Sequence, residues 1–248
     1  MNAVLLSGFE QGHITGSEGH PWLQKFEGMF EHIVKAYEFI RDNDMMIVLP
    51  GVVENKAVQK NAWHVFPIYV NRNNPQYIDF LSYQLGVDIR AVQQVLRQNM
   101  KEIFAVLDAM TEDSPIINVT FYRMRPGTTL KLHADSGSFQ YRAHMGVQVP
   151  KGNCGLKVKD SVVRWKEGRF FVFDSTQPHM AWNLTDEERI VFSIDFLREP
   201  VAANRDVHLQ EVLRRMDSTP LGFEGGGYLE IDAETMNKFN RIVDVVEF

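Results

Sequence analysis

Apolar residues in the first half of the chain recur at steps of three and four positions, the spacing of a helix that buries one face. Segments 22–44 and 88–108 both show this pattern, and we expect a long amphipathic helix in each. Asp88 stands at the start of the second segment and is a suitable N-cap residue. Between the two helices, segment 62–70 predicts a strand that ends in a loop at 71–75.

From residue 116 the pattern changes to an alternation of apolar and polar positions, which is typical of half-buried strands. Turn-forming pairs such as Pro126-Gly127 separate the alternating segments. The predicted strands are 116–124, 142–149, 156–159, 161–165, 169–173 and 189–196. Short strands at this spacing indicate a sandwich or a barrel, so we expect a mainly β core with helical additions packed on its outside.

After residue 200 the sequence predicts a helix at 206–216, a glycine-rich loop at 222–228 and a last helix from about residue 232. The loop is either part of a lid or an ordinary surface connection. The sequence shows no internal repeat, and we expect one domain over 1–248. Its expected parts are a mainly helical flank (1–112), a catalytic core (113–200) and C-terminal helices with the possible lid (201–248).

The composition of the chain argues against some binding partners and locations. With 248 residues, 44% hydrophobic and 23% charged, it is ordinary for a folded protein. A formal net charge of −6 argues against a nucleic-acid partner, which usually needs a basic face. No apolar run approaches the roughly 18 residues of a membrane span, and the start of the sequence lacks a basic leader. The single cysteine, Cys154, excludes an intrachain disulfide and favours a reducing compartment, so we expect a cytoplasmic protein.

Two histidines and an aspartate form a candidate metal site. His133 and Asp135 are two positions apart, so on a regular strand both side chains point to the same face. His179 lies 44 residues beyond Asp135, far enough to return on a facing strand. Two imidazoles and one carboxylate leave half of an octahedral ion open, which is the ligand set of non-haem Fe(II) oxygenases. In the competing interpretations the histidines are ordinary core or surface residues, and Asp135 caps the turn that follows it.

Three further polar residues suggest an anion beside this site. Alternation places Arg189 on the same strand face as Val191, Ser193 and Asp195, and a buried arginine is costly unless an anion meets it. A dicarboxylate such as 2-oxoglutarate would form a forked pair of charge-assisted hydrogen bonds with it. Arg142 and His144 also share one strand face. The alternatives are a pairing of Arg189 with Asp186 or Glu188, a surface position for Arg142, and metal binding by His144.

Motifs along 116–200 carry a family likeness. They are Tyr-Arg-Met-Arg-Pro-Gly-Thr at 122–128, His133, Arg-Ala-His-Met-Gly-Val at 142–147, Trp-Lys-Glu-Gly-Arg-Phe-Phe-Val-Phe-Asp at 165–174, His179 and Arg189. In these residues the chain resembles the aspartyl/asparaginyl β-hydroxylase family of Fe(II)/2-oxoglutarate dioxygenases, and segment 62–69 adds a weaker likeness. The fold that suits both this family and the strand pattern is a double-stranded β-helix, that is, a jelly-roll or cupin-like core.

The resemblance implies specific roles for five residues. His133 and His179 would bind iron, while Arg142, His144 and Arg189 would hold 2-oxoglutarate. The implied reaction consumes O2 and 2-oxoglutarate and releases succinate and CO2. The protein would supply the geometry, the dry pocket and an anchor for the acid.

Two positions depart from the vertebrate members of the family. Tyr122 stands where those enzymes have a small hydroxyl residue that also helps to hold 2-oxoglutarate. At the position of Asp135 they have a glycine, so this chain keeps a carboxylate that they lack. Related halogenases replace the carboxylate so that chloride can bind the metal, and its presence here therefore favours hydroxylation.

The expected function is hydroxylation of an unactivated C–H bond in a small molecule, with a free or carrier-tethered amino acid as our first choice. Alternatives are halogenation or desaturation at the same site, a peptide, nucleotide or lipid substrate, a zinc hydrolase or cupin-type isomerase, and a 2-oxoglutarate or metal sensor. A carrier protein is a possible partner, and the sequence leaves the oligomeric state open. The candidate substrate contacts are Arg123, Arg125, Gln140, Tyr141 and Arg164.

Overall fold

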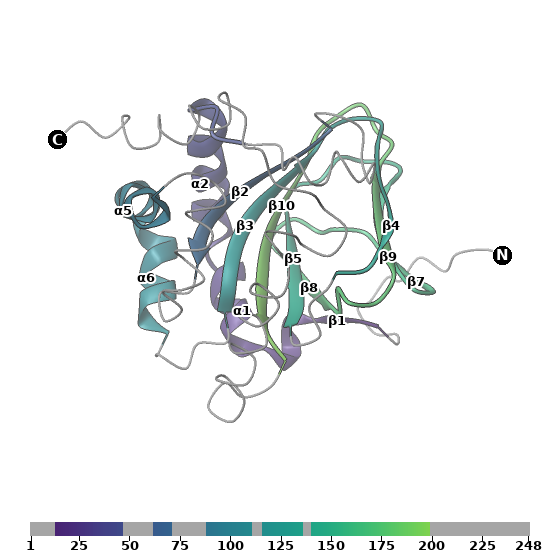
Figure 1. Cartoon of the computed structure of the whole chain (residues 1–248), viewed down its shortest axis with the longest axis horizontal. Helices are drawn as coiled ribbons and strands as arrows, with labels where there is room; N and C mark the ends of the chain where they lie inside the picture. Colours follow the sequence, from purple (N-terminus) through teal and green to yellow (C-terminus); the bar gives the residue numbers. More distant parts are fainter. Residues whose placement is uncertain (1–12, 47–61, 71–87, 111–115, 136–139, 199–248) are drawn as a thin grey trace, which may run out of the picture.

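The computed structural model describes residues 13–46, 62–70, 88–110, 116–135 and 140–198. Helices cover one side of a large sheet, and a smaller sheet lies against its other side (Figure 1). The helices are the 3-10 turn η1 (Ser17–Gly19), α1 (Pro21–Glu27), α2 (Phe30–Asp42), α5 (Ile89–Asn99) and α6 (Lys101–Ala109). Within these described ranges, no helix is long and apolar enough to cross a membrane.

Ten strands are described, and they form two antiparallel sheets. The larger sheet has the order β1-β8-β5-β10-β3-β2 and the smaller has the order β4-β9-β6-β7. The strands are β1 (Ile14–Gly16), β2 (Trp63–Val70), β3 (Ile116–Met124), β4 (Thr128–His133), β5 (Gln140–Gln148), β6 (Cys154–Val158), β7 (Ser161–Val163), β8 (Phe170–Phe173), β9 (His179–Asn183) and β10 (Arg189–Leu197). From β3 onward the chain passes back and forth between the two sheets, which confirms the expected jelly-roll core.

The two faces of β10 separate the helical layer from the interior of the jelly roll. Ile190, Phe192 and Ile194 pack with the helices in one hydrophobic cluster, whereas Val191 joins a second cluster between the sheets. The neighbouring strand β5 behaves in the same way, with Ala143 among the residues that face the helices. The predicted alternation of both strands is therefore confirmed, and their polar residues lie on the face toward the small sheet.

Each of the two predicted long helices is interrupted. The first is split into α1 and α2 at Gly28 and Met29, and glycine is a poor residue for a helix interior. The second is split into α5 and α6 at Met100. There, Nδ2 of Asn99 donates to the carbonyl oxygen of Val95, a local bond that competes with a continuous helix. The N-cap prediction is confirmed, because Asp88 accepts from the backbone N–H of residues 90 and 91.

The alternation pattern did not identify β1, β4 or β9, although the predicted metal site assumed a regular strand at His133 and Asp135. Two of these carry the candidate histidines, at the end of β4 and the start of β9. The predicted loop at 71–75, the tail elements at 206–216 and from 232, and the glycine-rich segment at 222–228 lie outside the described residues.

Candidate active site

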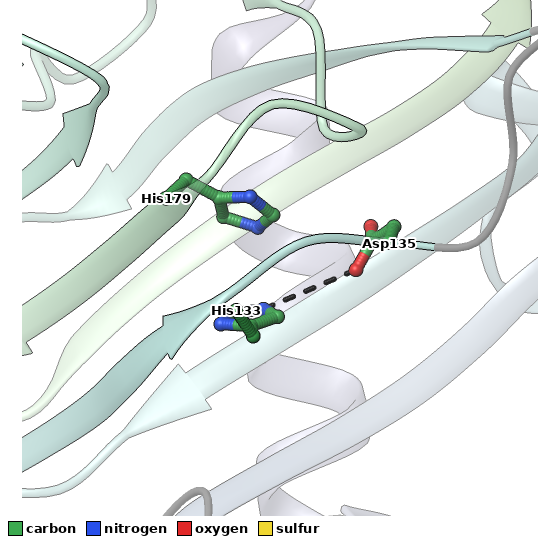
Figure 2. Close-up of side chains that lie close together, drawn as sticks. All are labelled: His133, Asp135 and His179. Atoms are coloured by element: carbon green, nitrogen blue, oxygen red, sulfur yellow. Dashed lines mark ion pairs between the residues drawn. The ribbon is translucent and has the colours of Figure 1, made fainter. Parts of the chain in front are cut away.

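The three candidate metal ligands meet at one end of the small sheet. His133 and His179 are direct cross-strand partners in the β4–β9 pair, and their ring centroids are 4.2 Å apart. Nε2 of His133 lies 3.9 Å from Oδ1 of Asp135. One ligand atom from each of the three residues lies within 4.8 Å of the others. Figure 2 shows the three side chains pointing toward one common space.

Backbone carbonyl groups orient both imidazole rings. Nδ1 of His133 lies 2.7 Å from the carbonyl oxygen of Lys131, and Nδ1 of His179 lies 2.9 Å from that of Gln177. A ring that donates from Nδ1 has its lone pair on Nε2, the arrangement found in most metal-binding histidines. The two rings are therefore prepared to bind a metal through Nε2.

The protonation states of the cluster also suit a metal. Burial and the neighbouring His133 lower the pKa of His179 to about 4, although Asp135 and the backbone act in the opposite direction. Burial alone would raise the pKa of Asp135, but Arg142, His179 and His133 together lower it below its ordinary value. At neutral pH, His179 is thus a neutral imidazole and Asp135 an ionised carboxylate. The donor set fits Fe(II) in its residue types and in its open coordination face.

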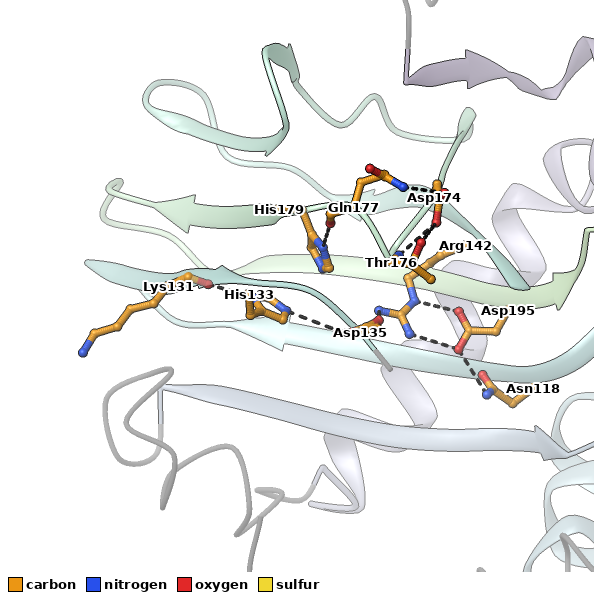
Figure 3. A network of polar contacts seen from close by, with 10 residues as sticks. All are labelled: Asn118, Lys131, His133, Asp135, Arg142, Asp174, Thr176, Gln177, His179 and Asp195. Atoms are coloured by element: carbon orange, nitrogen blue, oxygen red, sulfur yellow. Dashed lines mark hydrogen bonds and ion pairs between the residues drawn. The ribbon is translucent and has the colours of Figure 1, made fainter. Parts of the chain in front are cut away.

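A hydrogen-bonded turn between β8 and β9 positions the cluster (Figure 3). Asp174 accepts from the backbone N–H of Thr176 at 2.9 Å, from its hydroxyl at 2.6 Å and from Nε2 of Gln177 at 3.2 Å. Arg198 also pairs with Asp174. The N–H of Asp135 donates to the carbonyl oxygen of Ser175 at 2.9 Å. The same turn therefore leads into His179 and holds Asp135 beside it.

Arg142 lies between two aspartates. Nε and Nη2 donate to the two carboxylate oxygens of Asp195, at 2.6 and 3.1 Å. Nη1 lies 2.8 Å from Oδ2 of Asp135. The assignment of Arg142 to 2-oxoglutarate stays a prediction, and the guanidinium contacts two protein carboxylates in the structure.

Arg189 is buried without a counter-charge. The residue is only 2% exposed, and its guanidinium carbon lies 4.4 Å from the centre of the Trp165 ring. Among the described residues, no carboxylate forms an ion pair with it, and its Nε has no hydrogen-bond acceptor. Burial lowers its pKa to about 10. The alternative pairing of Arg189 with Asp186 or Glu188 does not form, which leaves a buried cation available to an anion.

His144 is a second buried donor beside Arg189. Its Nδ1 accepts from Nε1 of Trp165 at 3.4 Å, so in a neutral ring the proton is on Nε2. Burial, followed by the charges of Arg142 and Arg189, lowers its pKa well below the ordinary value. Nε2 is buried and has no acceptor within the described part of the chain. Two unused donors that converge near Trp165 suit a carboxylate-bearing ligand.

The position of Trp165 depends on a close backbone approach at Gly146. A Cβ atom on that residue would lie 2.9 Å from the carbonyl oxygen of Lys166. Without it, the N–H of Gly146 donates to the same oxygen at 3.2 Å. The turn that carries Trp165 is therefore held against β5 by a glycine.

Of the other predicted site residues, Tyr122 and Gln140 lie on the interior side. Tyr122 stacks on Trp63 with ring centroids 5.2 Å apart and lies 5.9 Å from the His144 ring. Gln140 is on the same strand as Arg142 and two residues before it, so it shares that face.

The remaining candidate substrate contacts are not brought to the metal cluster. Arg123 and Arg125 lie 3.9 and 4.0 Å from the carboxylate of Glu188. The ring of Tyr141 packs on Phe196, with centroids 5.9 Å apart, on the helix-covered face. Arg164 is exposed.

Sequence reasoning missed two residues of this region. Trp165 contacts both His144 and Arg189, although it was noted only as part of a motif. Asp195 binds Arg142, and its place on the same strand face as Arg189 was the signal that pointed to it. A carboxylate predicted on an inward face needs a cation, and Arg142 is its direct cross-strand neighbour.

Comparison with known proteins supports the family resemblance. The model of the aspartyl/asparaginyl β-hydroxylase family matches residues 35–199. An ornithine lipid ester-linked acyl 2-hydroxylase from Rhizobium tropici is 31% identical over 103 residues, which are 41% of this chain and 37% of that protein. The aspartyl/asparaginyl β-hydroxylase of Homo sapiens is 29% identical over 189 residues, covering 74% of this chain and 23% of that protein.

Among solved structures, a Pseudomonas putida prolyl-4-hydroxylase matches with a TM-score of 0.41 and 13% identity, over 69% of this chain and 88% of that one. The chain spans only 23% to 37% of the length of the two relatives above. The family model, by contrast, covers more than half of the chain. By this match, the chain belongs to the aspartyl/asparaginyl β-hydroxylase family.

Proposed function

We propose that this protein is an Fe(II)- and 2-oxoglutarate-dependent dioxygenase that hydroxylates an unactivated C–H bond of a small molecule. One observation carries the proposal: a His133–Asp135–His179 cluster lies in the same jelly-roll interior as Arg189, a buried cation to which no described residue supplies a counter-charge. A metal site alone would suit many enzymes. A metal site together with a buried anion site suits 2-oxoglutarate.

The residues divide the work between metal and acid. His133, Asp135 and His179 would hold the iron and leave half of its coordination positions open. Arg189 would pair with the far carboxylate of 2-oxoglutarate, and His144 would donate from Nε2 to the same ligand. When bound, iron and 2-oxoglutarate supply the oxidation chemistry with O2, and succinate and CO2 are released.

The zinc hydrolase alternative explains less of the interior. A non-redox metal could use the same three ligands, but it gives no role to the uncompensated charge of Arg189. Burying that cation opposes folding unless a ligand or another function offsets the cost. A 2-oxoglutarate sensor would use both sites, and turnover distinguishes it from an enzyme.

For the substrate, we propose a free or carrier-tethered amino acid, in keeping with the family to which the chain belongs. An acyl lipid is the second candidate. One relative is itself named an acyl 2-hydroxylase. The proposal includes a cytoplasmic location, based on the single cysteine, and one domain over residues 1–248 with a core at 113–200.

The test is an anaerobic titration with Fe(II) and 2-oxoglutarate, followed by the visible charge-transfer band of the chelate. The wild-type protein should develop the band and, with O2, release succinate. Candidate amino acids and acyl lipids are then screened for perturbation of the band. Retention of zinc with no 2-oxoglutarate turnover under any substrate would favour the hydrolase, and tight 2-oxoglutarate binding without decarboxylation would favour the sensor.

A further inference from the structure

Asp195, Arg142 and Asn118 form one row across three strands of the large sheet. Asp195 on β10 is the direct cross-strand partner of Arg142 on β5 and of Asn118 on β3. Nδ2 of Asn118 donates to Oδ2 of Asp195 at 3.2 Å. Figure 3 shows this row leading to Asp135, where the guanidinium of Arg142 reaches across from the large sheet.

Asp135 needs support from outside its own strand. Strand β4 ends at His133, so Asp135 lies beyond the regular ladder of the small sheet. Its backbone N–H donates to the carbonyl oxygen of Ser175. Its carboxylate has Oδ2 at Arg142 and Oδ1 on the side of His133. The ion pair with Arg142 therefore engages one carboxylate oxygen and leaves the other on the side of the histidines.

We propose that Asp195 is a positioning residue of the metal site: it fixes Arg142, and Arg142 fixes the carboxylate of Asp135 with one oxygen turned toward the metal. Arg142 is then a positioning residue as well. The inference rests on the proposed function, because it takes His133, Asp135 and His179 as the ligands of a metal.

The geometry of the Arg142–Asp195 pair suits this role. Two parallel bonds between a guanidinium and a carboxylate fix direction as well as distance, unlike a single contact. Both partners are on central strands of the sheet, and Asp195 is only 4% exposed. An arginine anchored in this way presents its third nitrogen to Asp135 at a constant place.

Charge balance points in the same direction. Alone, the charge of Arg142 would pair fully with Asp135 and compete with a metal cation for that carboxylate. With Asp195 bound, Arg142 and Asp195 together are neutral, and Asp135 keeps its negative charge for the metal. Each nitrogen of the guanidinium already faces a carboxylate oxygen, whereas Arg189 and His144 have donors without acceptors.

The test measures binding of Co(II), an optical substitute for Fe(II), to the full-length protein. Asp195→Asn removes the charge and one of the two oxygen acceptors with little change in shape. Loss of a residue that orients a metal ligand typically weakens metal binding 10- to 100-fold, and we expect a loss in this range. Asp108→Asn is the matched control, because Asp108 also receives two bonds from one arginine, Arg97, but on α5 and α6. It should leave Co(II) affinity within about twofold of wild type.

A double-mutant cycle separates positioning from a general loss of structure. In an Asp135→Ala background, Asp195→Asn should cause no further loss of Co(II) affinity, since the carboxylate that it positions is gone. An equal loss in both backgrounds, or an unchanged affinity in the single variant, would overturn the inference. If Asp195→Asn does not fold, Asn118→Ala removes only the bond to Oδ2. It should weaken Co(II) binding severalfold, and an unchanged affinity would again overturn the inference.

The competing role of Arg142 has its own signature. Arg142→Lys should weaken Co(II) binding, and 2-oxoglutarate binding at saturating Co(II) should change little. The reverse result, unchanged Co(II) affinity with a large loss of 2-oxoglutarate affinity, would assign Arg142 to the anion and refute the inference. Failure of the wild-type protein to bind Co(II) would refute the proposed function, and the inference with it.

Discussion

Arg189→Met separates the function of the buried arginine from its contribution to the fold. Methionine is unbranched and uncharged, and it keeps the apolar stem of the side chain while removing the guanidinium. Because burial lowers the pKa of Arg189 to about 10, well below its ordinary value, the charged form is less stable in the folded protein than in the unfolded chain. At about 1.4 kcal/mol for each pKa unit, the charge opposes folding by about 3 kcal/mol. This opposition is complete below pH 10 and decreases as the pH rises above 10 toward the ordinary pKa of arginine.

The substitution also removes a favourable contact. The guanidinium lies over the ring of Trp165 at 4.4 Å, and a desolvated contact of this kind contributes about 2 kcal/mol. The net expectation is an apoprotein that is as stable as wild type or about 1 kcal/mol more stable. For a chain of this size, that difference raises the melting temperature by about 2–4 °C. Thermal melting of the apoprotein at pH 7 measures it.

Arg189→Met should weaken 2-oxoglutarate binding, although it leaves the stability of the apoprotein unchanged or higher. Removing one member of a buried charge pair costs about 2–5 kcal/mol, so 2-oxoglutarate affinity should fall by about 30-fold or more. The assay is calorimetric titration of the metal-loaded protein. Arg123→Met is the matched control, since that arginine already has Glu188 within 3.9 Å and lies on the helix-covered face. It should leave 2-oxoglutarate affinity unchanged. An Arg189→Met apoprotein that melts well below wild type, or that binds 2-oxoglutarate within threefold of it, would refute the reasoning.

The other predictions concern single contacts. Trp165→Phe removes the N–H that donates to His144 and should weaken 2-oxoglutarate binding by roughly fivefold, the value of one hydrogen bond, as measured by the same titration. His133→Ala removes a ligand itself, so Co(II) affinity should fall by more than the roughly 100-fold limit of an outer contact, and an unchanged Co(II) spectrum would contradict this. Gly155→Ala places a Cβ 2.8 Å from the Trp182 ring and should destabilise the fold by about 1–3 kcal/mol, seen as a lower melting temperature.

The alternation pattern predicted the large sheet well because each of its central strands has one face in each hydrophobic cluster. Strand β10 is the clearest case, with Ile190 on the helical side and Val191 between the sheets. The pattern did not reveal β4, because Lys131 and Leu132 are exposed one after the other, so polar and apolar positions do not alternate with burial there. The start and end of β4 depend on its pairing with β9, which lies about fifty residues further along the chain.

The ligand set was predicted from residue types and order, but part of the reasoning was wrong. The sequence analysis placed His133 and Asp135 on one face of a regular strand, whereas β4 ends at His133. Asp135 reaches the cluster because its N–H binds Ser175 and its carboxylate meets Arg142. Contacts of this kind join distant segments and leave no periodic trace in the sequence.

The direct pairing of His133 with His179 has a consequence for how the protein loses its ion. Among the described strands, β4 is an edge strand of the small sheet and pairs with β9, with an irregular register between Leu130 and His133. A metal ion bound by both imidazoles would link β4 to β9 at the point where their pairing is irregular. Removal of the metal should therefore open the β4–β9 pairing before the rest of the fold. Amide hydrogen exchange in β4 should become faster, while the central strands stay protected.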